Sequence, residues 1–384
     1  MFRKISFFAF LIVLIFVLIN LVTGKRTNQE SVTNRTQNTT QTTLSLGDTP
    51  LLSTIAENLE VPWAIAFLPD GGMLVTERKG TIRRVDANGL LNSNPVLTIT
   101  DVKQIGEGGL HGIVLHPQFE SNHFVYLYYT YSSSGNNTLN KVVRYTFANN
   151  LLLNQTAIVD KIPGASNHDG GRIKFGPDDF LYITTGDAQD PSLAQNKNSL
   201  AGKILRVTDA GKPASGNPFI NADGDDRVYS YGHRNPQGIC WSENGEMWET
   251  EHGPSGIQSG NDELNRIVIG ANYGWPTIQG YQTSSGMVTP IANSGTSDTW
   301  APAGAACIEG SVYFGGLRGE ALYQATITGD TAQVKEHFKE ELGRIREVIL
   351  GLDELLYIST SNRDGRGVPN SEDDKILRVS QNKL

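Results

Sequence analysis

Two polar, glycine-rich segments carry residue types that could act on a small substrate. The first, residues 166–172 (SNHDGGR), places His168 among carboxylate and glycine neighbours. A histidine on such a loop can serve as a general base near neutral pH, although a solvated or structural histidine would have the same neighbours. The second, residues 231–238 (YGHRNPQG), offers Arg234 and Asn235 beside a turn. A guanidinium next to an amide suits binding of a carboxylate through two hydrogen bonds.

A third region could hold a metal ion. It begins at residues 251–254 (EHGP) and continues through residues 262–265 (DELN) to residues 272–276 (NYGWP). The backbone carbonyls of Gly253 and Pro254, together with nearby carboxylates, are the hard oxygen ligands that Ca²⁺ prefers. The spacing is not that of an EF-hand loop, and the chain has no cysteine and histidine pattern typical of zinc sites.

A fourth segment, residues 343–347 (GRIRE), places two cations on one side of a strand. Arg344 and Arg346 are two positions apart, and residues two apart in an extended strand point the same way. A solvated strand face would explain this spacing as well. All four segments fall between the strands of a long-period repeat, so one ring of loops could bring them together.

The repeat predicts the fold. Each unit begins with a short apolar and aromatic strand and ends with a basic and apolar strand, usually Lys-Ile-x-Arg-Val. The first strands of the six units begin at Met73, Val125, Leu181, Met247, Val312 and Leu356. This spacing predicts an all-β, six-bladed β-propeller with loops gathered around a central channel, and residues 51–58 would supply the closing strand of the last blade. The alternative, a β-sandwich plus a second domain, does not predict six matching units. The best helical window, residues 333–341, is short.

Charge and cysteine content limit the possible partners. The 384 residues include 32 Lys and Arg against 40 Asp and Glu, a net charge of -8. An extended phosphate-binding surface is therefore not expected, and neither is a nucleic-acid partner. Cys240 and Cys307 can form at most one disulfide, and the sequence alone does not decide whether their geometry allows it.

The N-terminus predicts export. Residues 5–22 are apolar except for a serine and an asparagine, which is short for a membrane-spanning helix and long for a signal-peptide core. No clear small-residue cleavage site follows, which favours an uncleaved anchor. We therefore expect a membrane anchor or signal segment at residues 1–25, a Thr/Asn/Gln-rich disordered tether at residues 26–48 and the propeller at residues 49–384. The protein would be extracytoplasmic, and four N-glycosylation patterns begin at Asn34, Asn38, Asn136 and Asn154.

Eight segments resemble those of a known family. GEGGLHGIVLHPQF, NHDGGRIKFGPDDFLYITTGD, GKILRV, GHRNPQG, EHGP, NDELN, NYGWP and GRIREV occur in this order in the soluble quinoprotein sugar dehydrogenases. The resemblance covers about residues 50–380. Members of this family are six-bladed propellers that use pyrroloquinoline quinone (PQQ) and Ca²⁺ to oxidise aldoses to lactones. The resemblance therefore implies this fold, these cofactors and this activity.

The resemblance also implies roles for individual residues. His168 matches the general base, and Arg234 matches a residue in contact with quinone and sugar. The positions matched to cofactor contacts are Arg234, Asn235, Arg318, Arg344, Arg346, Glu107 and Trp300. The carbonyls of Gly253 and Pro254 match ligands of a catalytic Ca²⁺, whereas Glu263 and the carbonyl of Tyr273 match ligands of a second, structural Ca²⁺.

Three positions depart from the family pattern. Arg318 stands where a lysine is usual, Asn167 stands where glucose-specific members have aspartate, and Glu107 stands where glutamine is expected. If Glu107 lies near the sugar, it is expected to disfavour anionic substrates. If it is also buried, we expect its pKa to be raised, because burial disfavours a charged carboxylate. These departures bear on substrate range more than on the cofactor.

The implied reaction needs an electron acceptor outside the protein. His168 would take the proton of the C1 hydroxyl while hydride leaves C1 for the quinone, and Ca²⁺ would polarise the accepting carbonyl. The reduced quinone would then pass its electrons to an external quinone or redox protein. Two alternatives are a Ca²⁺-dependent lactonase-type hydrolase and a non-catalytic propeller that binds a partner. Neither needs the four converging cations Arg234, Arg318, Arg344 and Arg346.

Overall fold

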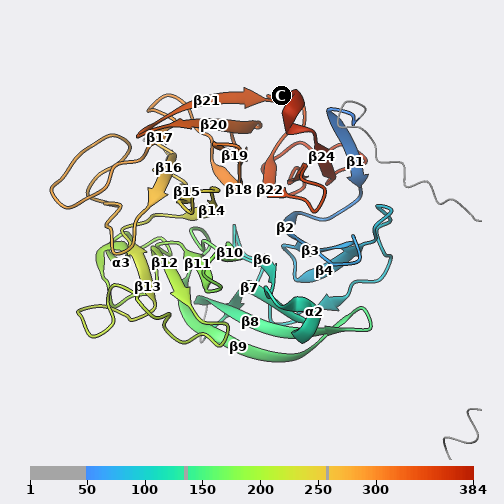
Figure 1. Ribbon diagram of the computed structural model, residues 1–384, viewed down its shortest axis with the longest axis horizontal. Coiled ribbons are helices and arrows are strands. Elements are labelled where there is room, and N and C mark those ends of the chain that lie inside the picture. Colours follow the sequence, from blue (N-terminus) through green and yellow to red (C-terminus); the bar gives the residue numbers. More distant parts are fainter. Residues whose placement is uncertain (1–48, 134–136, 257–258) are drawn as a thin grey trace, which may run out of the picture. The chain divides into compact units, whose positions relative to one another are not determined.

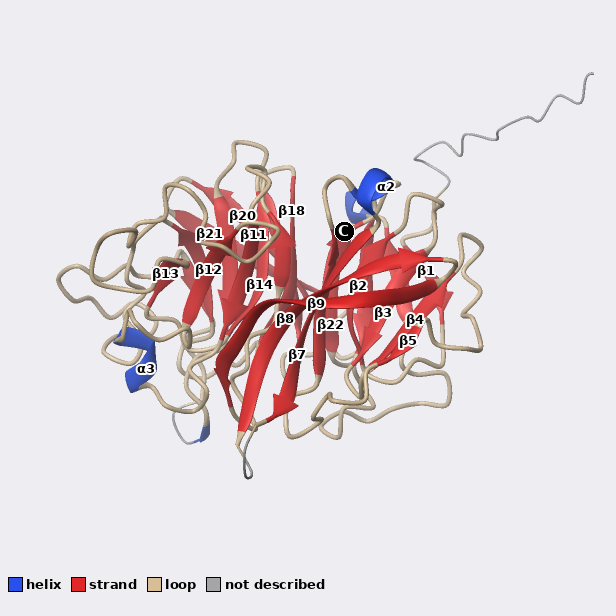
Figure 2. Ribbon diagram, turned by 90° about the horizontal axis from the view of Figure 1, so that it is seen from below, coloured by secondary structure: helices blue, strands red, loops and turns tan. Residues whose placement is uncertain are grey.

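The computed structural model describes residues 49–133, 137–256 and 259–384. The predicted anchor and tether, residues 1–48, lie outside the described residues. None of the helices within these ranges is both long and apolar enough to cross a membrane. The helices α2 (Phe119–Asn122) and α3 (Ser192–Gln195) are short and lie at the periphery of the strands (Figure 2), and the short 3₁₀ helix η2 (Gln381–Lys383) lies at the C-terminus.

Six four-stranded antiparallel sheets follow one another around a ring (Figure 1). The predicted six-bladed propeller is therefore confirmed. Blade 1 contains β2 (Pro62–Phe67), β3 (Met73–Glu77), β4 (Thr81–Val85) and β5 (Leu97–Thr98). Blade 2 contains β6 (Leu110–Leu115), β7 (Phe124–Ser132), β8 (Thr138–Ala148) and β9 (Leu151–Gly164). Blade 3 contains β10 (Ile173–Phe175), β11 (Leu181–Thr185), β12 (Lys203–Val207) and β13 (Val228–Tyr231).

The last blade is completed by the first strand of the chain. Blade 4 contains β14 (Pro236–Trp241), β15 (Met247–Glu251), β16 (Glu263–Ile267) and β17 (Ala292–Asn293). Blade 5 contains β18 (Pro302–Ile308), β19 (Ser311–Gly316), β20 (Leu322–Thr328) and β21 (Thr331–His337). Blade 6 contains β22 (Ile345–Leu350), β23 (Leu356–Thr360), β24 (Ile376–Val379) and β1 (Leu52–Ala56). β1 pairs antiparallel with β24, which confirms the closing strand expected at residues 51–58.

The apolar strand that opens each repeat unit is the second strand of its blade. These are β3, β7, β11, β15, β19 and β23, and the strands β3, β11, β15 and β23 are buried at every residue. Each blade is covered on both faces by its neighbours, so these strands open with buried apolar and aromatic residues, and the Thr, Ser and Glu residues that follow are buried as well. The apolar clusters accordingly join neighbouring blades, as where Trp63 of blade 1 packs in one cluster with Leu127 of blade 2.

The helical window at residues 333–341 is not helical. β21 occupies most of it and pairs with β20 over seven residues at the outer edge of blade 5. Its burial alternates along the strand, with polar residues toward solvent, as expected of an outer strand. Tertiary pairing with β20 overrides the local helical tendency of its Lys and Glu residues.

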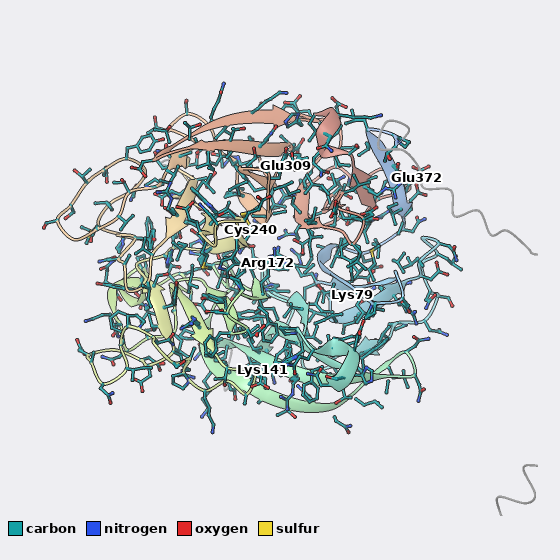
Figure 3. All side chains as sticks on the ribbon, in the orientation of Figure 1. Lys79, Lys141, Arg172, Cys240, Glu309 and Glu372 are labelled. Carbon is teal, nitrogen blue, oxygen red and sulfur yellow. A yellow bond between two sulfur atoms is a disulfide. The ribbon has the colours of Figure 1, made fainter. Side chains whose placement is uncertain are left out.

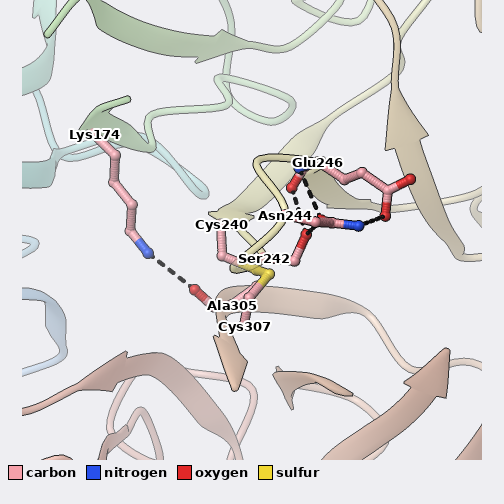
Figure 4. The surroundings of a disulfide bond; sticks show 7 residues. All are labelled: Lys174, Cys240, Ser242, Asn244, Glu246, Ala305 and Cys307. Carbon is pink, nitrogen blue, oxygen red and sulfur yellow. Dashed lines mark hydrogen bonds between the residues drawn. A yellow bond between two sulfur atoms is a disulfide. The ribbon is translucent and has the colours of Figure 1, made fainter. Parts of the chain in front are cut away.

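A disulfide joins two blades. Cys240 in β14 is bonded to Cys307 in β18, with a Cα to Cα distance of 5.6 Å (Figure 4). This decides the pairing that the sequence left open. Near the middle of the ring, Arg172 forms a buried ion pair of 2.5 Å with Glu347 of blade 6 (Figure 3). Blades 3 and 6 are thereby linked across the channel by a charge pair.

Candidate active site

A cavity of about 640 Å³ gathers side chains from all six blades. Eight of the residues predicted to form the site line it: Glu107, His168, Arg234, Gly253, Pro254, Arg318, Arg344 and Arg346. They come from loops far apart in sequence, as the ring of inter-strand loops requires. The four predicted residues that do not line it are Asn235, Glu263, Tyr273 and Trp300.

His168 is held in one orientation by a carboxylate. Its Nδ1 lies 2.7 Å from Oδ1 of the fully buried Asp187, which also accepts a hydrogen bond from the Trp275 indole. Because an ionised Asp187 can only accept, Nδ1–H is the donor of this hydrogen bond, and in the neutral imidazole the lone pair is on Nε2. Nε2 is therefore the nitrogen able to take a proton from a bound molecule.

The backbone of the His168 loop packs closely against Gly186. His168 has a φ of 63°, in the left-handed region, and its carbonyl lies against Gly186 of the next loop. A Cβ on Gly186 would lie 1.9 Å from that carbonyl oxygen, so no other residue fits there. The Gly186 and Asp187 pair directly after β11 thus both admits the His168 loop and supplies its carboxylate.

Five arginines give the cavity a positive charge. Arg234, Arg318, Arg344, Arg346 and Arg366 line it, against the three carboxylic acids Glu107, Asp169 and Asp262, a net of two positive charges. In a protein with a net charge of -8, this is a local concentration of cations. Such a cavity suits an anion with several carboxylates.

Several of these arginines have no carboxylate partner of their own. Arg344 and Arg346 share one acid, Asp364, at 2.8 and 3.5 Å. Burial, partly offset by Asp364 and reinforced by neighbouring arginines, lowers the pKa of Arg346 to about 10. Within the described ranges, the Nε–H of Arg234 donates to no acceptor, and Arg318 forms no ion pair or hydrogen bond.

Glu107 is paired, and its pKa is lowered. Its carboxylate lies 2.8 Å from the guanidinium of Arg366 and accepts a hydrogen bond of 3.3 Å from the His168 amide. Burial alone would raise its pKa, but His252, Arg366 and the His168 amide together lower it to about 2. The expected raised pKa of Glu107 is therefore wrong, because the sequence could not show that Arg366 lies beside it.

Gly253 and Pro254 line the cavity, and their carbonyl oxygens accept no hydrogen bond from the described residues. Asp262 braces this loop, since one carboxylate oxygen accepts from the Gly253 amide at 2.8 Å and the other from the Ala301 amide at 2.8 Å. The two free carbonyl oxygens can therefore serve as ligands of a hard cation, as the sequence predicts.

Glu263 and Tyr273 line a second, smaller pocket, whose wall also includes Gly253 and Pro254. Here Glu249, Glu251 and Glu263 all accept hydrogen bonds from the single Asn265 amide, at 3.1 to 3.3 Å. None of the three forms an ion pair with Lys or Arg among the described residues. Burial, and then the charge of Glu251, raises the pKa of both Glu249 and Glu263.

This carboxylate cluster also contains orphaned polar atoms. Oε1 of Glu249 and Nδ1 of the fully buried His233 have no hydrogen-bond partner, and Nδ1 lies 3.6 Å from Glu251. The carbonyl of Tyr273 accepts no hydrogen bond from any described residue. Three buried carboxylates without a cation are costly, so this environment fits a bound divalent cation.

Two predicted cofactor contacts lie behind the cavity wall. Trp300 is 5% exposed and packs against Phe314 and Tyr323 in the core between blades 4 and 5, while its neighbours Thr299 and Ala301 line the cavity. The cofactor contact predicted for Trp300 has no support in this placement. Asn235 is fully buried, and its Oδ1 accepts a hydrogen bond from the Gly170 amide at 3.0 Å, so it ties the His168 loop to blade 4.

Three functional side chains were missed from the sequence. Asp187 could have been suspected, because a Gly-Asp pair follows directly after a predicted strand. Asp262 lies beside the predicted ligand Glu263, but its hydrogen bonds to two backbone amides have no sequence signal. Arg366 lies in a loop of Gly, Asn and Asp residues with no pattern that marks it, so only the tertiary structure identifies it.

A model of one family matches nearly all of the propeller. Residues 59–377 match the Glucose / Sorbosone dehydrogenase family. The chain belongs to this family. The predicted resemblance to the quinoprotein sugar dehydrogenases is confirmed, as is the prediction that the protein is a sugar dehydrogenase.

Similar proteins from this family span most of the chain. The aldose sugar dehydrogenase YliI of Escherichia coli is 33% identical over 342 residues, covering 81% of this chain and 90% of that protein. The quinoprotein glucose dehydrogenase B of Acinetobacter calcoaceticus is 32% identical over 264 residues, 60% of this chain and 53% of that protein. The PQQ-bound aldose sugar dehydrogenase of Streptomyces coelicolor superposes with a TM-score of 0.79 at 40% identity, covering 86% of this chain and 96% of that one.

Proposed function

We propose that the cavity binds PQQ and that the protein oxidises the C1 hydroxyl of aldose sugars to give lactones, with Ca²⁺ as a second cofactor. The observation that carries this proposal is the excess of arginines over carboxylic acids around the cavity. PQQ is a planar tricarboxylate, and the fork of a guanidinium pairs with a carboxylate through two hydrogen bonds. The family relatives named for quinone or bound to PQQ support the same assignment.

The residues of the chain supply the proton transfer. Nε2 of His168 is free to accept the proton of the sugar C1 hydroxyl, and Asp187 stabilises the imidazolium that results. When bound, PQQ supplies an electrophilic carbonyl that accepts hydride, and Ca²⁺ assists as a Lewis acid. Arg234 also lines the cavity, where its guanidinium can contact both cofactor and substrate.

The donor sets fit Ca²⁺ at two places. Gly253 and Pro254 offer free carbonyl oxygens at the cavity, where a cation would assist the reaction. Glu263 and the Tyr273 carbonyl lie in the pocket with the uncompensated carboxylates, where a cation would stabilise the fold. We assign the first pair to a catalytic ion and the second to a structural ion.

A hydrolase or a non-catalytic binding module is less well supported. Neither activity calls for cations such as Arg318, which lines the cavity without a partner among the described residues. Neither calls for a histidine whose tautomer is fixed by a buried carboxylate beside those cations.

The direct test is reconstitution. Purified protein is assayed for dye-linked aldose oxidation, and its absorption spectrum is recorded, before and after addition of PQQ with Ca²⁺. We expect the quinone spectrum and the activity to appear together, and the product to be the lactone. Quinone binding with no oxidation of any aldose would contradict the proposed reaction, and absence of quinone binding would contradict the cofactor. His123→Asn, at an exposed histidine outside the cavity, is the matched control for cavity substitutions.

We further propose that the enzyme works outside the cytoplasm, near a membrane, and passes electrons to an external quinone or redox protein. The disulfide between Cys240 and Cys307 supports this location, because such bonds persist in oxidising compartments. The apolar segment at residues 5–22 would provide the membrane attachment. Membrane fractionation of the full chain tests the attachment, and recovery of the protein in the soluble cytoplasmic fraction would contradict the location.

A further inference from the structure

One ion pair of the cavity lining is partly exposed to solvent. Arg366 and Glu107 both line the cavity, and their side chains are 55% and 27% exposed. Nη1 of Arg366 lies 2.8 Å from Oε1 of Glu107. The two residues are 259 positions apart, Arg366 in the loop between β23 and β24 and Glu107 in the loop between β5 and β6.

The same pair reaches the loop of the general base. Nη2 of Arg366 donates a hydrogen bond of 3.3 Å to Oδ1 of Asn167. The second oxygen of Glu107 accepts a hydrogen bond of 3.3 Å from the backbone amide of His168. Arg366 therefore links blade 6 to the loop that carries His168, through Asn167, and to the neighbouring loop that carries Glu107.

The loop that carries Arg366 is fixed at the arginine wall of the cavity. The Arg366 amide donates to Asp364 at 2.9 Å, and Asp364 also binds the side chains of Arg344 and Arg346. The position of Arg366 is thus set by the residues we assign to the quinone, and the ion pair extends from that wall toward the sugar side.

We propose that Arg366 is a specificity-determining residue whose ion pair with Glu107 forms a charge-neutral clasp at the sugar entrance, so that neither charge by itself biases the enzyme toward or against sugar acids. This inference rests on the proposed function, because it assumes that sugar enters past the exposed pair. The paired charges cancel toward an incoming molecule. Either charge left alone would attract or repel an anionic sugar.

The two single substitutions therefore have opposite effects. Glu107→Gln leaves Arg366 unpaired, so the ratio of kcat/KM for glucuronate to kcat/KM for glucose should rise by roughly five- to tenfold. Arg366→Gln leaves Glu107 unpaired, so the same ratio should fall by roughly five- to tenfold. The double variant removes both charges and should return the ratio close to that of the native protein. A merely structural role would change both sugars together and would not produce opposite signs.

The experiment measures kcat/KM for glucose and glucuronate with protein loaded with PQQ and Ca²⁺, at low and at high salt. Arg378→Gln is the matched control, because it removes a paired cation of blade 6 that does not line the cavity. Saturation-transfer NMR on cofactor-free protein gives the ratio of the two bound sugars without any turnover. High salt should reduce the differences between the variants.

The outcomes separate this inference from the proposed function. A bound-sugar ratio that shifts as expected, without oxidation of either sugar, refutes the proposed reaction alone. Oxidation of both sugars with one ratio for all variants overturns the clasp, as does failure of both sugars to bind. Shifts of the same sign in the two single variants also overturn it.

Discussion

His168 and its carboxylate partner are the residues on which the proposed chemistry depends most directly. We expect His168→Ala to lower turnover by about 10²–10⁴-fold while PQQ still binds, because a general base contributes an amount of this order. His168→Asn should do the same with less disturbance, since asparagine tolerates the left-handed φ of 63° better than alanine does. Steady-state turnover at saturating sugar, with quinone absorbance to confirm loading, is the measurement.

Asp187→Asn provides the second arm of this test. An amide nitrogen in place of the carboxylate oxygen can donate to Nδ1, which would leave the proton on Nε2 and remove the base. Turnover should therefore fall with PQQ binding retained. Native turnover in both His168 variants would remove His168 from the mechanism, and native turnover in Asp187→Asn would show that the tautomer is set in another way.

Asp169 makes stability depend on pH. Burial, only partly offset by hydrogen bonds from Asn140 and the Ala165 amide, raises its pKa to about 7. Between about pH 4 and 7 the folded state therefore holds a proton that the unfolded state releases. The free energy of unfolding should fall as pH rises through this window, by up to about 1.4 kcal/mol per unit.

Asp169→Asn should remove this slope, because an amide does not titrate in this range. The fold should tolerate the change, since the amide Oδ1 can still accept the hydrogen bond from Asn140. Thermal unfolding of both proteins at pH 5, 6, 7 and 8 should show that the stability of the variant increases relative to that of the native protein as pH rises. Asp330→Asn, at a side chain that is 90% exposed, is the control. Parallel stability curves for the native protein and Asp169→Asn would contradict the raised pKa.

At the scale of the elements, the disulfide between β14 and β18 is the one covalent cross-link between blades, apart from the chain itself, in the described residues. It closes a loop of 67 residues, for which the loss of chain entropy in the unfolded state is worth roughly 4 kcal/mol at most. Replacing Cys240 and Cys307 together by serine should lower the free energy of unfolding by about 2–4 kcal/mol. Neither cysteine lines the cavity, so the variant should still bind PQQ.

Denaturant unfolding measures this loss, and reduction provides the control. Dithiothreitol should destabilise the native protein to a similar extent and should not affect the double serine variant. A native protein whose unfolding midpoint does not respond to the reductant would show that the bond contributes nothing to stability.

At the scale of the whole molecule, we expect Ca²⁺ to act twice. A metal that binds only the folded state adds stability by mass action, about 2.7 kcal/mol at a free concentration 100 times Kd. A chelator should therefore abolish activity, through the site of Gly253 and Pro254, and also lower the melting temperature, through Glu263. Glu263→Ala should reduce the thermal response to Ca²⁺ more than it reduces turnover.

The two effects of Ca²⁺ are read separately, by calorimetry and by the aldose assay at matched free Ca²⁺. Glu336→Ala, at an exposed carboxylate of β21, is the control for loss of one acidic side chain. A melting temperature unchanged by chelation would contradict the structural site, whereas activity unchanged by chelation would contradict the catalytic one.

The sequence by itself determined the propeller, the closing strand and most of the cavity wall. The second strand of each blade contains a short buried run of apolar and aromatic residues, so six such runs at similar spacing could be recognised locally. His168, Arg234 and Arg344 lie in loops between strands of that repeat, Arg346 lies at the start of β22, and the ring brings these positions together.

Only the tertiary structure decided which charges meet. The pairing of Glu107 with Arg366 joins residues 259 positions apart, and it reversed the expected direction of the Glu107 pKa. The tertiary structure also decided that Trp300 packs in the core and does not line the cavity. It decided the role of Asp187 too, because that role depends on the close approach of Gly186 to the His168 carbonyl. Periodicity reports which side of a strand is buried, but a side chain's partner and its pKa depend on distances across blades, which no local pattern contains.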